Sequence, residues 1–222
     1  AKSGKKILFV ATKKQAKDIV AEKATSVNMP YVIERWPGGM LTNFPTIRKA
    51  VKKMANIDKL MSDGTYSNLS KRELLQITRQ RAKLEKNLGS IADLTRLPSA
   101  LFVVDVMKEK IAVSEAKRLG IPVFGIVDTN SNPNNIDYVI PANDDATSSI
   151  DVILGAVVEA IKEGLEERRI ERADEEAQRA EANAPAAEET EKAPRRKRIA
   201  KTSKAAPKPA EPAAEAEEPK AE

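Results

Sequence analysis

The 222-residue chain contains no cysteine and no histidine. Without cysteine it has no disulfide framework and no thiolate metal site, and its composition says nothing about redox compartment. Without histidine it lacks the usual general base, the commonest side-chain metal ligand and every Ser-His or Cys-His nucleophile pair. These two absences exclude most hydrolase mechanisms.

Long apolar runs are also missing. No stretch of about 18 apolar residues occurs, and the opening AKSGKKILFVATKK is a short strand-like run rather than a signal peptide. We therefore expect a cytoplasmic protein with no membrane partner. Because the chain starts with alanine and enters a strand almost at once, we also expect that a natural N-terminal segment is missing from it.

Aliphatic residues become scarce toward the C-terminus. In residues 183–222 the only aliphatic residue other than alanine is Ile199, and six of the 13 prolines fall there. Such a segment cannot bury enough apolar surface to offset the entropy of ordering it. We predict a disordered C-terminal tail over residues 183–222, preceded by a helix extension over residues 170–182.

Charge is distributed unevenly along the chain. Residues 1–169 hold 27 Lys and Arg against 20 Asp and Glu, a net charge of +7, whereas residues 170–222 hold 11 against 13, a net charge of −2. Aromatic residues make up only 4% of the whole chain. A basic body with few aromatics suits a phosphate-rich partner, although many unrelated basic proteins share this composition.

Strand and helix patterns alternate along much of the chain. Strands are predicted at residues 7–11, 31–34, 101–105, 122–128 and 138–140, and those at 7–11 and 101–105 have the apolar runs of buried strands. Helices are predicted at residues 13–26, at 108–120 (closed by Gly120) and from Thr147 onward. This alternation predicts an α/β fold with a doubly wound, mainly parallel sheet of the flavodoxin or Rossmann type, covered by helices on both faces.

Residues 46–89 interrupt this alternation with two helical patterns, which predict a coiled-coil-like hairpin inserted into an α/β domain of residues 1–169. The first pattern places Ile47, Ala50, Val51, Met54, Ile57 and Met61 on one face. The second begins at a Ser70–Glu73 capping box and continues with Leu74, Ile77, Arg81, Leu84 and Leu88. A protein-only adaptor built on a long coiled coil is an alternative function, but Arg81 at a seam position disfavours it.

The stretch RWPGGMLTNF, residues 35–44, contains the only tryptophan. Gly38 and Gly39 could cradle a phosphate or simply turn the chain, and neither a GxGxxG nor a GxxxxGK[ST] motif is present to support nucleotide binding. Trp36 offers a plane for base stacking, or else anchors the loop in the core together with Phe44. Thr42 and Asn43 offer polar groups to an RNA backbone or sugar.

Basic residues gather around this stretch and in the following helix. Arg48, Lys49, Lys52 and Lys53 share one helix face, and Lys13, Lys14 and Arg35 lie near the ends of other elements. Together they could hold several phosphates by charge and counterion release, or form only a solvated surface. The candidate RNA-binding set is Lys13, Lys14, Arg35, Trp36, Gly38, Gly39, Thr42, Asn43, Arg48, Lys49, Lys52 and Lys53.

Aspartates follow two of the predicted strands. Asp105 and Asp128 stand where open α/β sheets bind ligands, and Asp144 and Asp145 could join them in a Mg²⁺ site. This leaves a Mg²⁺-dependent enzyme or phosphoacceptor domain as an alternative function. Carboxylates that close strands more often cap helices or form turns, and no histidine supports catalysis, so we expect no catalytic residue, no metal and no cofactor.

Four segments resemble the bacterial family of small-subunit ribosomal protein two, the S-two family. They are ILFVATKKQA, RWPGGMLTNF, PSALFVVDVMKEKIAVSEAKRLGIP and DTNSNPNNIDYVIPANDDA. In the third, Pro98, Asp105, Glu109, Glu115, Gly120 and Pro122 fit the family's spacing. The resemblance spans residues 5 to about 169.

The resemblance implies a structural constituent of the small ribosomal subunit with no enzymatic activity and no small-molecule substrate. The partners it implies are small-subunit ribosomal RNA and neighbouring ribosomal proteins, including ribosomal protein S-one. It also implies that RWPGGMLTNF is a rigid connection shaping a surface that meets RNA. Two features depart from the family: the usual N-terminal segment with a Gly-His motif is absent, and Pro37 replaces a common leucine, which should stiffen the turn.

Overall fold

The computed structural model describes the backbone of residues 1–63 and 69–182, and side chains as far as residue 176. The predicted disordered tail, residues 183–222, lies outside the described residues, as does most of the turn that joins the two predicted hairpin helices.

Five parallel strands form one sheet in the order β2-β1-β3-β4-β5. These are β1 (Ile7–Val10), β2 (Tyr31–Val32), β3 (Ala100–Val104), β4 (Val123–Val127) and β5 (Tyr138–Pro141), so every predicted strand is confirmed. Strand β2 is shorter than predicted, because its partner β1 ends at Val10, which pairs with Val32. Ile33 and Glu34, which were predicted to continue the strand, therefore have no residue of β1 to pair with.

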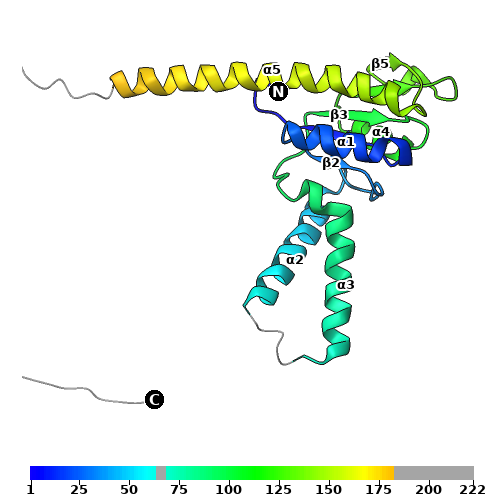
Figure 1. Ribbon diagram of the computed structural model, residues 1–222, viewed down its shortest axis with the longest axis vertical. Coiled ribbons are helices and arrows are strands. Elements are labelled where there is room, and N and C mark those ends of the chain that lie inside the picture. Colours follow the sequence, from blue (N-terminus) through cyan, green and yellow to red (C-terminus); the bar gives the residue numbers. More distant parts are fainter. Residues whose placement is uncertain (64–68, 183–222) are drawn as a thin grey trace, which may run out of the picture. The chain divides into compact units, whose positions relative to one another are not determined.

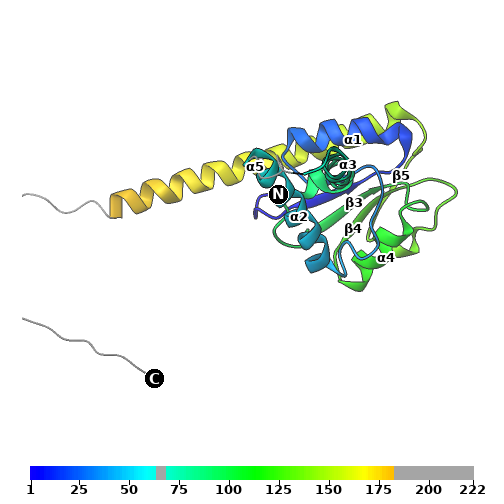
Figure 2. The ribbon, with the colours of Figure 1, turned by 90° about the horizontal axis from the view of Figure 1, so that it is seen from below.

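Successive strand residues point to opposite faces of the sheet and build two cores. Leu8 and Val10 belong to one cluster of buried side chains, whereas Phe9 belongs to the other. Helices α1 (Lys14–Ser26) and α5 (Thr147–Ala182) cover the Phe9 face, and α4 (Lys110–Arg118) covers the opposite face (Figures 1 and 2). Helices on both faces confirm the doubly wound α/β class.

Helix α4 is shorter than predicted at its N-terminal end. The side chain of Asp105 accepts the backbone N–H of Lys108 at 3.0 Å, and Asp105 itself has φ of 67°. These residues therefore form a turn, and the helix begins only at Lys110. Gly120 follows its end with φ of 65°, as expected of a glycine that closes a helix.

The inserted hairpin consists of α2 (Phe44–Ser62) and α3 (Lys71–Leu88), followed by a short 3-10 turn, η2 (Gly89–Ile91). Both halves of the Ser70–Glu73 capping box are formed. At the base of the hairpin, Ile47 and Leu84 pack against the core that contains Leu8 and Val10, which we call the α4-side core. Arg81, at the predicted seam position, pairs with Asp58 of α2, so its charge is neutralised within the hairpin. A second 3-10 turn, η3 (Pro133–Asn135), precedes β5.

Candidate nucleic-acid interface

The segment between β2 and α2 wraps around one carboxylate. Glu115 projects from α4, is only 8% exposed, and accepts hydrogen bonds from the indole Nε1–H of Trp36 at 3.2 Å and the backbone N–H of Gly39 at 2.8 Å. Its second oxygen accepts the backbone N–H groups of Leu41 at 2.9 Å and Thr42 at 3.1 Å, and the Thr42 hydroxyl at 3.2 Å. One buried side chain therefore fixes the shape of this loop.

Burial of Glu115 alone would raise its pKa, since a carboxylate loses hydration inside a protein. The hydrogen bonds from Thr42, Leu41, Trp36 and Gly39 outweigh that effect and hold the pKa of Glu115 below its ordinary value. The group is therefore ionised at neutral pH, and the loop closes around a negative charge.

The loop's own side chains divide between core and surface. Trp36 is 7% exposed and belongs to the α4-side core, and Phe44 is half-buried against that core. Of the two alternatives for Trp36, base stacking or anchoring the loop in the core, the structure shows the second. Gly39 has φ of 82°, so it serves as a turn residue. Gly38 and Thr42 are exposed, and so is Asn43, which accepts a hydrogen bond from Thr46.

Helix α2 carries the basic face immediately after this loop. Its apolar residues Met54 and Ile57 are buried, whereas Met61 near its end is 38% exposed. Four basic side chains lie exposed on the other side: Arg48, Lys49, Lys52 and Lys53. Arg48 Nη1 donates to the carbonyl of Thr95 at 2.9 Å. In the described part of the chain, none of the three lysines forms an ion pair, which leaves their charges for an external anion.

The three remaining basic candidates lie elsewhere. Arg35 is exposed and borders a hollow of about 520 Å³ at the base of the hairpin, beside the loop. Lys14 is exposed at the start of α1, which packs on the opposite face of the sheet from the loop. The structure therefore does not gather all twelve candidates on one surface.

Lys13 is the least accessible of the basic candidates, with a side chain only 13% exposed. Its ammonium lies 2.8 Å from Asp144, 2.5 Å from Asp145 and 3.7 Å from Asp105. Burial alone would lower the pKa of Lys13, but the hydrogen bonds to Asp144 and Asp145 outweigh it and raise the pKa above its ordinary value. Lys13 is therefore charged, and its charge is balanced internally.

The strands β1 and β3 are parallel neighbours, but the chain leads from β1 to β2 on one side of them and from β3 to β4 on the other. In doubly wound folds the carboxyl ends of two such strands mark the position where ligands usually bind. Here protein side chains fill it. Glu109, 3% exposed, accepts the backbone N–H of Thr12 at 3.1 Å and also the Thr12 hydroxyl, and Lys13 lies beside this pair. Burial raises the pKa of Glu109, against the opposing effect of these hydrogen bonds.

Comparison with known proteins decides the family. The sequence profile described as ribosomal protein S2 matches residues 1–164. The chain is 80% identical over 185 residues to the small ribosomal subunit protein uS2 of Phocaeicola vulgatus, covering 83% of this chain and 66% of that protein. It is 81% identical over 177 residues to the proteins of the same name from Parabacteroides distasonis and Bacteroides thetaiotaomicron, covering 80% of this chain and 64% of each.

The chain belongs to the ribosomal protein S2 family. It spans slightly less than two thirds of the length of these S2 relatives. Among the described helices, none contains a segment both long and apolar enough to cross a lipid bilayer.

Glu115 fits the S2 family's spacing, but its role in holding the loop is not predicted from the sequence. The sequence does contain a signal, because the spacing of Ala112, Glu115 and Ala116 places them on one face of a helix. In the structure all three are buried on α4. A carboxylate within such an apolar stripe requires hydrogen-bond donors from another segment. The spacing within α4 does not predict which segment supplies these donors, because they come from a loop more than 70 residues earlier.

Proposed function

We propose that this S2-family chain is a structural constituent of the small ribosomal subunit in the cytoplasm, that it binds small-subunit ribosomal RNA, and that it catalyses no reaction. Membership of the ribosomal protein S2 family carries the proposal, because its relatives are named as small ribosomal subunit proteins. The exposed basic face of α2 supports it physically, since clustered lysines release counterions when they neutralise phosphates.

The RNA-facing surface in this proposal consists of Arg48, Lys49, Lys52 and Lys53, with Arg35, Gly38, Thr42 and Asn43 beside them. Trp36 and Gly39 shape the loop that presents these groups, while Lys14 lies apart, near the start of α1. The predicted domain of residues 1–169, with its hairpin at 46–89 and a helix extension at 170–182, remains the unit that we propose to enter the subunit. We further propose neighbouring ribosomal proteins as partners, among them ribosomal protein S-one.

A Mg²⁺-dependent enzyme using Asp105 and Asp128 is not proposed. Nothing in the family match supports catalysis, and Lys13, Thr12 and Glu109 fill the place where such a fold would hold a substrate.

Sedimentation of the tagged full chain with purified ribosomal subunits tests the function. We expect it to co-sediment with small subunits depleted of their own S2 protein and not with large subunits, and to increase the retention of ribosomal protein S-one. Equal binding to both subunits would reject specific incorporation, and unchanged retention of S-one would reject that partner alone.

A further inference from the structure

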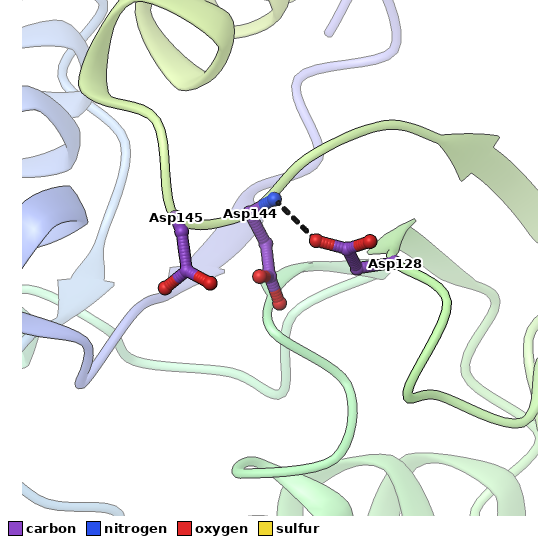
Figure 3. Close-up of side chains that lie close together, drawn as sticks. All are labelled: Asp128, Asp144 and Asp145. Atoms are coloured by element: carbon purple, nitrogen blue, oxygen red, sulfur yellow. Dashed lines mark hydrogen bonds between the residues drawn. The ribbon is translucent and has the colours of Figure 1, made fainter.

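Three aspartates at the carboxyl edge of the sheet form a cluster that the proposed RNA-binding function does not use (Figure 3). Asp128 follows β4, and Asp144 and Asp145 follow β5. One oxygen from each carboxylate lies within 4.8 Å of the others. Two oxygens on opposite sides of one ion are separated by about 4 Å for Mg²⁺ and about 5 Å for Ca²⁺, so the three are close enough to share a hard divalent cation.

Asp144 provides an independent observation. Its side chain is completely buried, yet its Oδ2 atom has no hydrogen-bond partner within the described part of the chain. Figure 3 shows its carboxylate between those of Asp145 and Asp128. Buried polar atoms are almost always satisfied in folded proteins, so an orphaned carboxylate oxygen inside an acidic cluster requires a partner.

The charge balance points the same way. The Lys13 ammonium is the only cation paired with Asp105, Asp144 and Asp145 among residues 1–63 and 69–176, and it pairs through Oδ1 of Asp144, not Oδ2. Asp128 has no ion pair within that part of the chain, and one of its carboxylate oxygens lies within 4.8 Å of a carboxylate oxygen of Asp144. One ammonium thus pairs with three carboxylates while Asp128 adds a fourth negative charge beside them, and a divalent cation would offset the excess.

The carboxylate of Asp128 is already oriented for such a role. One of its oxygens accepts the backbone N–H of Thr129 at 2.7 Å, and the other accepts the backbone N–H of Asp144 at 3.3 Å. A carboxylate oxygen has two acceptor positions, so each retains one for a metal. Backbone N–H groups that hold a ligand in place resemble the supporting hydrogen bonds of metal sites.

We propose that Asp128, Asp144 and Asp145 bind a structural divalent cation, Mg²⁺ or Ca²⁺, which ties the segment after β5 to the end of β4. All the ligands are oxygens, which favours these hard cations over zinc or copper. A catalytic Mg²⁺ site at these strand ends is one alternative that the sequence offers, although its lack of histidine favours no metal. The role inferred now is structural, and it requires neither a base nor a nucleophile.

The test uses the full chain after treatment with a chelator. MgCl₂ or CaCl₂ is titrated at constant ionic strength, and the melting temperature and the amide NMR shifts of Thr129, Asp144 and Asp145 are recorded. We expect a saturable rise in melting temperature and shifts confined to this cluster, with the tighter-binding salt identifying the ion. Absence of a saturable response to either ion in the unsubstituted chain would overturn the proposal.

Two variants and a control assign the ligands. Asp144→Asn and Asp128→Asn should each weaken binding of the preferred ion at least about tenfold. Asp18→Asn, at an exposed position on α1, should leave the binding unchanged. If Asp144→Asn responds to the ion as the unsubstituted chain does, the assigned site is wrong.

Discussion

The indole N–H of Trp36 and the carboxylate of Glu115 meet at 3.2 Å, which joins the loop after β2 to the helix after β3 across 79 positions of sequence. Both residues are buried, and the same carboxylate also binds three backbone N–H groups of the loop. The loop that precedes the basic helix α2 is therefore held by a contact that is local in space and distant in sequence.

Replacing Glu115 by glutamine should loosen this loop. Glutamine keeps one acceptor oxygen but directs an NH₂ group at N–H donors, so buried donors lose their partner. We expect Glu115→Gln to lower the free energy of unfolding by about 2–4 kcal/mol in urea titrations. Glu159→Gln, an exposed position on α5, should change it by less than about 0.5 kcal/mol. Equal effects of the two variants would show that Glu115 does not hold the loop.

The pH dependence of stability should separate Glu115 from Glu109. The pKa of folded Glu115 lies below the ordinary value of 4.5, so its contribution is present above that pH and is lost as the pH falls through the folded pKa. The pKa of Glu109 is raised, so its contribution is full below pH 4.5 and is lost as the pH rises through the folded pKa.

Urea unfolding of the two glutamine variants at a series of acidic pH values measures these opposite slopes. The deficit of Glu115→Gln relative to the unsubstituted chain should shrink as the pH falls. The stability of Glu109→Gln relative to the unsubstituted chain should improve as the pH rises from the acid limit. Slopes of the same sign in both variants would contradict the assigned hydrogen bonds.

The two adjacent glycines should respond differently to alanine. Gly39 has φ of 82°, and an added Cβ would lie 3.2 Å from Cβ of Asn43, so Gly39→Ala should cost about 1–2 kcal/mol of unfolding free energy. At Gly38, which has no positive φ, an added Cβ meets nothing within 4 Å, and the change should stay within about 0.5 kcal/mol. Thermal unfolding of both variants checks the contrast, and a larger loss at Gly38 would refute it.

Much of the fold was predictable because it depends on patterns that are local in sequence. Apolar runs identified all five strands, and helical spacing identified both helices of the hairpin. The ends of β2 and α4 were less accurate, because strand pairing and the turn at Asp105 set them. The site was harder, because Lys13 looks like any surface lysine until the aspartates that follow other strands are placed around it. Charge counting identifies basic residues, but only the fold shows which of their charges remain free.

Lys13 and Lys14 are adjacent in sequence and should nevertheless differ in their effect on stability. Lys13→Gln removes the ammonium paired with Asp144 and Asp145, so it should destabilise the fold and have little effect on the salt dependence of RNA binding. Lys14→Gln removes an exposed charge and should leave the melting temperature unchanged. If Lys13→Gln reduced the salt slope of RNA binding without lowering the melting temperature, Lys13 would be a phosphate contact instead.

The basic face of α2 gives the most direct test of RNA binding. Lys52→Glu combined with Lys53→Glu reverses two exposed charges without altering the buried face of the helix, so the melting temperature should hold while RNA affinity falls. If both lysines neutralise phosphates, the slope of log K against log salt should become shallower by roughly 1.4–1.8. Lys5→Glu combined with Lys162→Glu changes the net charge equally at exposed positions outside α2 and serves as the matched control. Filter binding to small-subunit RNA at several salt concentrations measures the affinity and the salt slope of both double variants.

Equal losses of affinity in the two double variants would mean that net charge alone drives association. An unchanged salt slope in the α2 variant would show that this helix does not contact RNA phosphates.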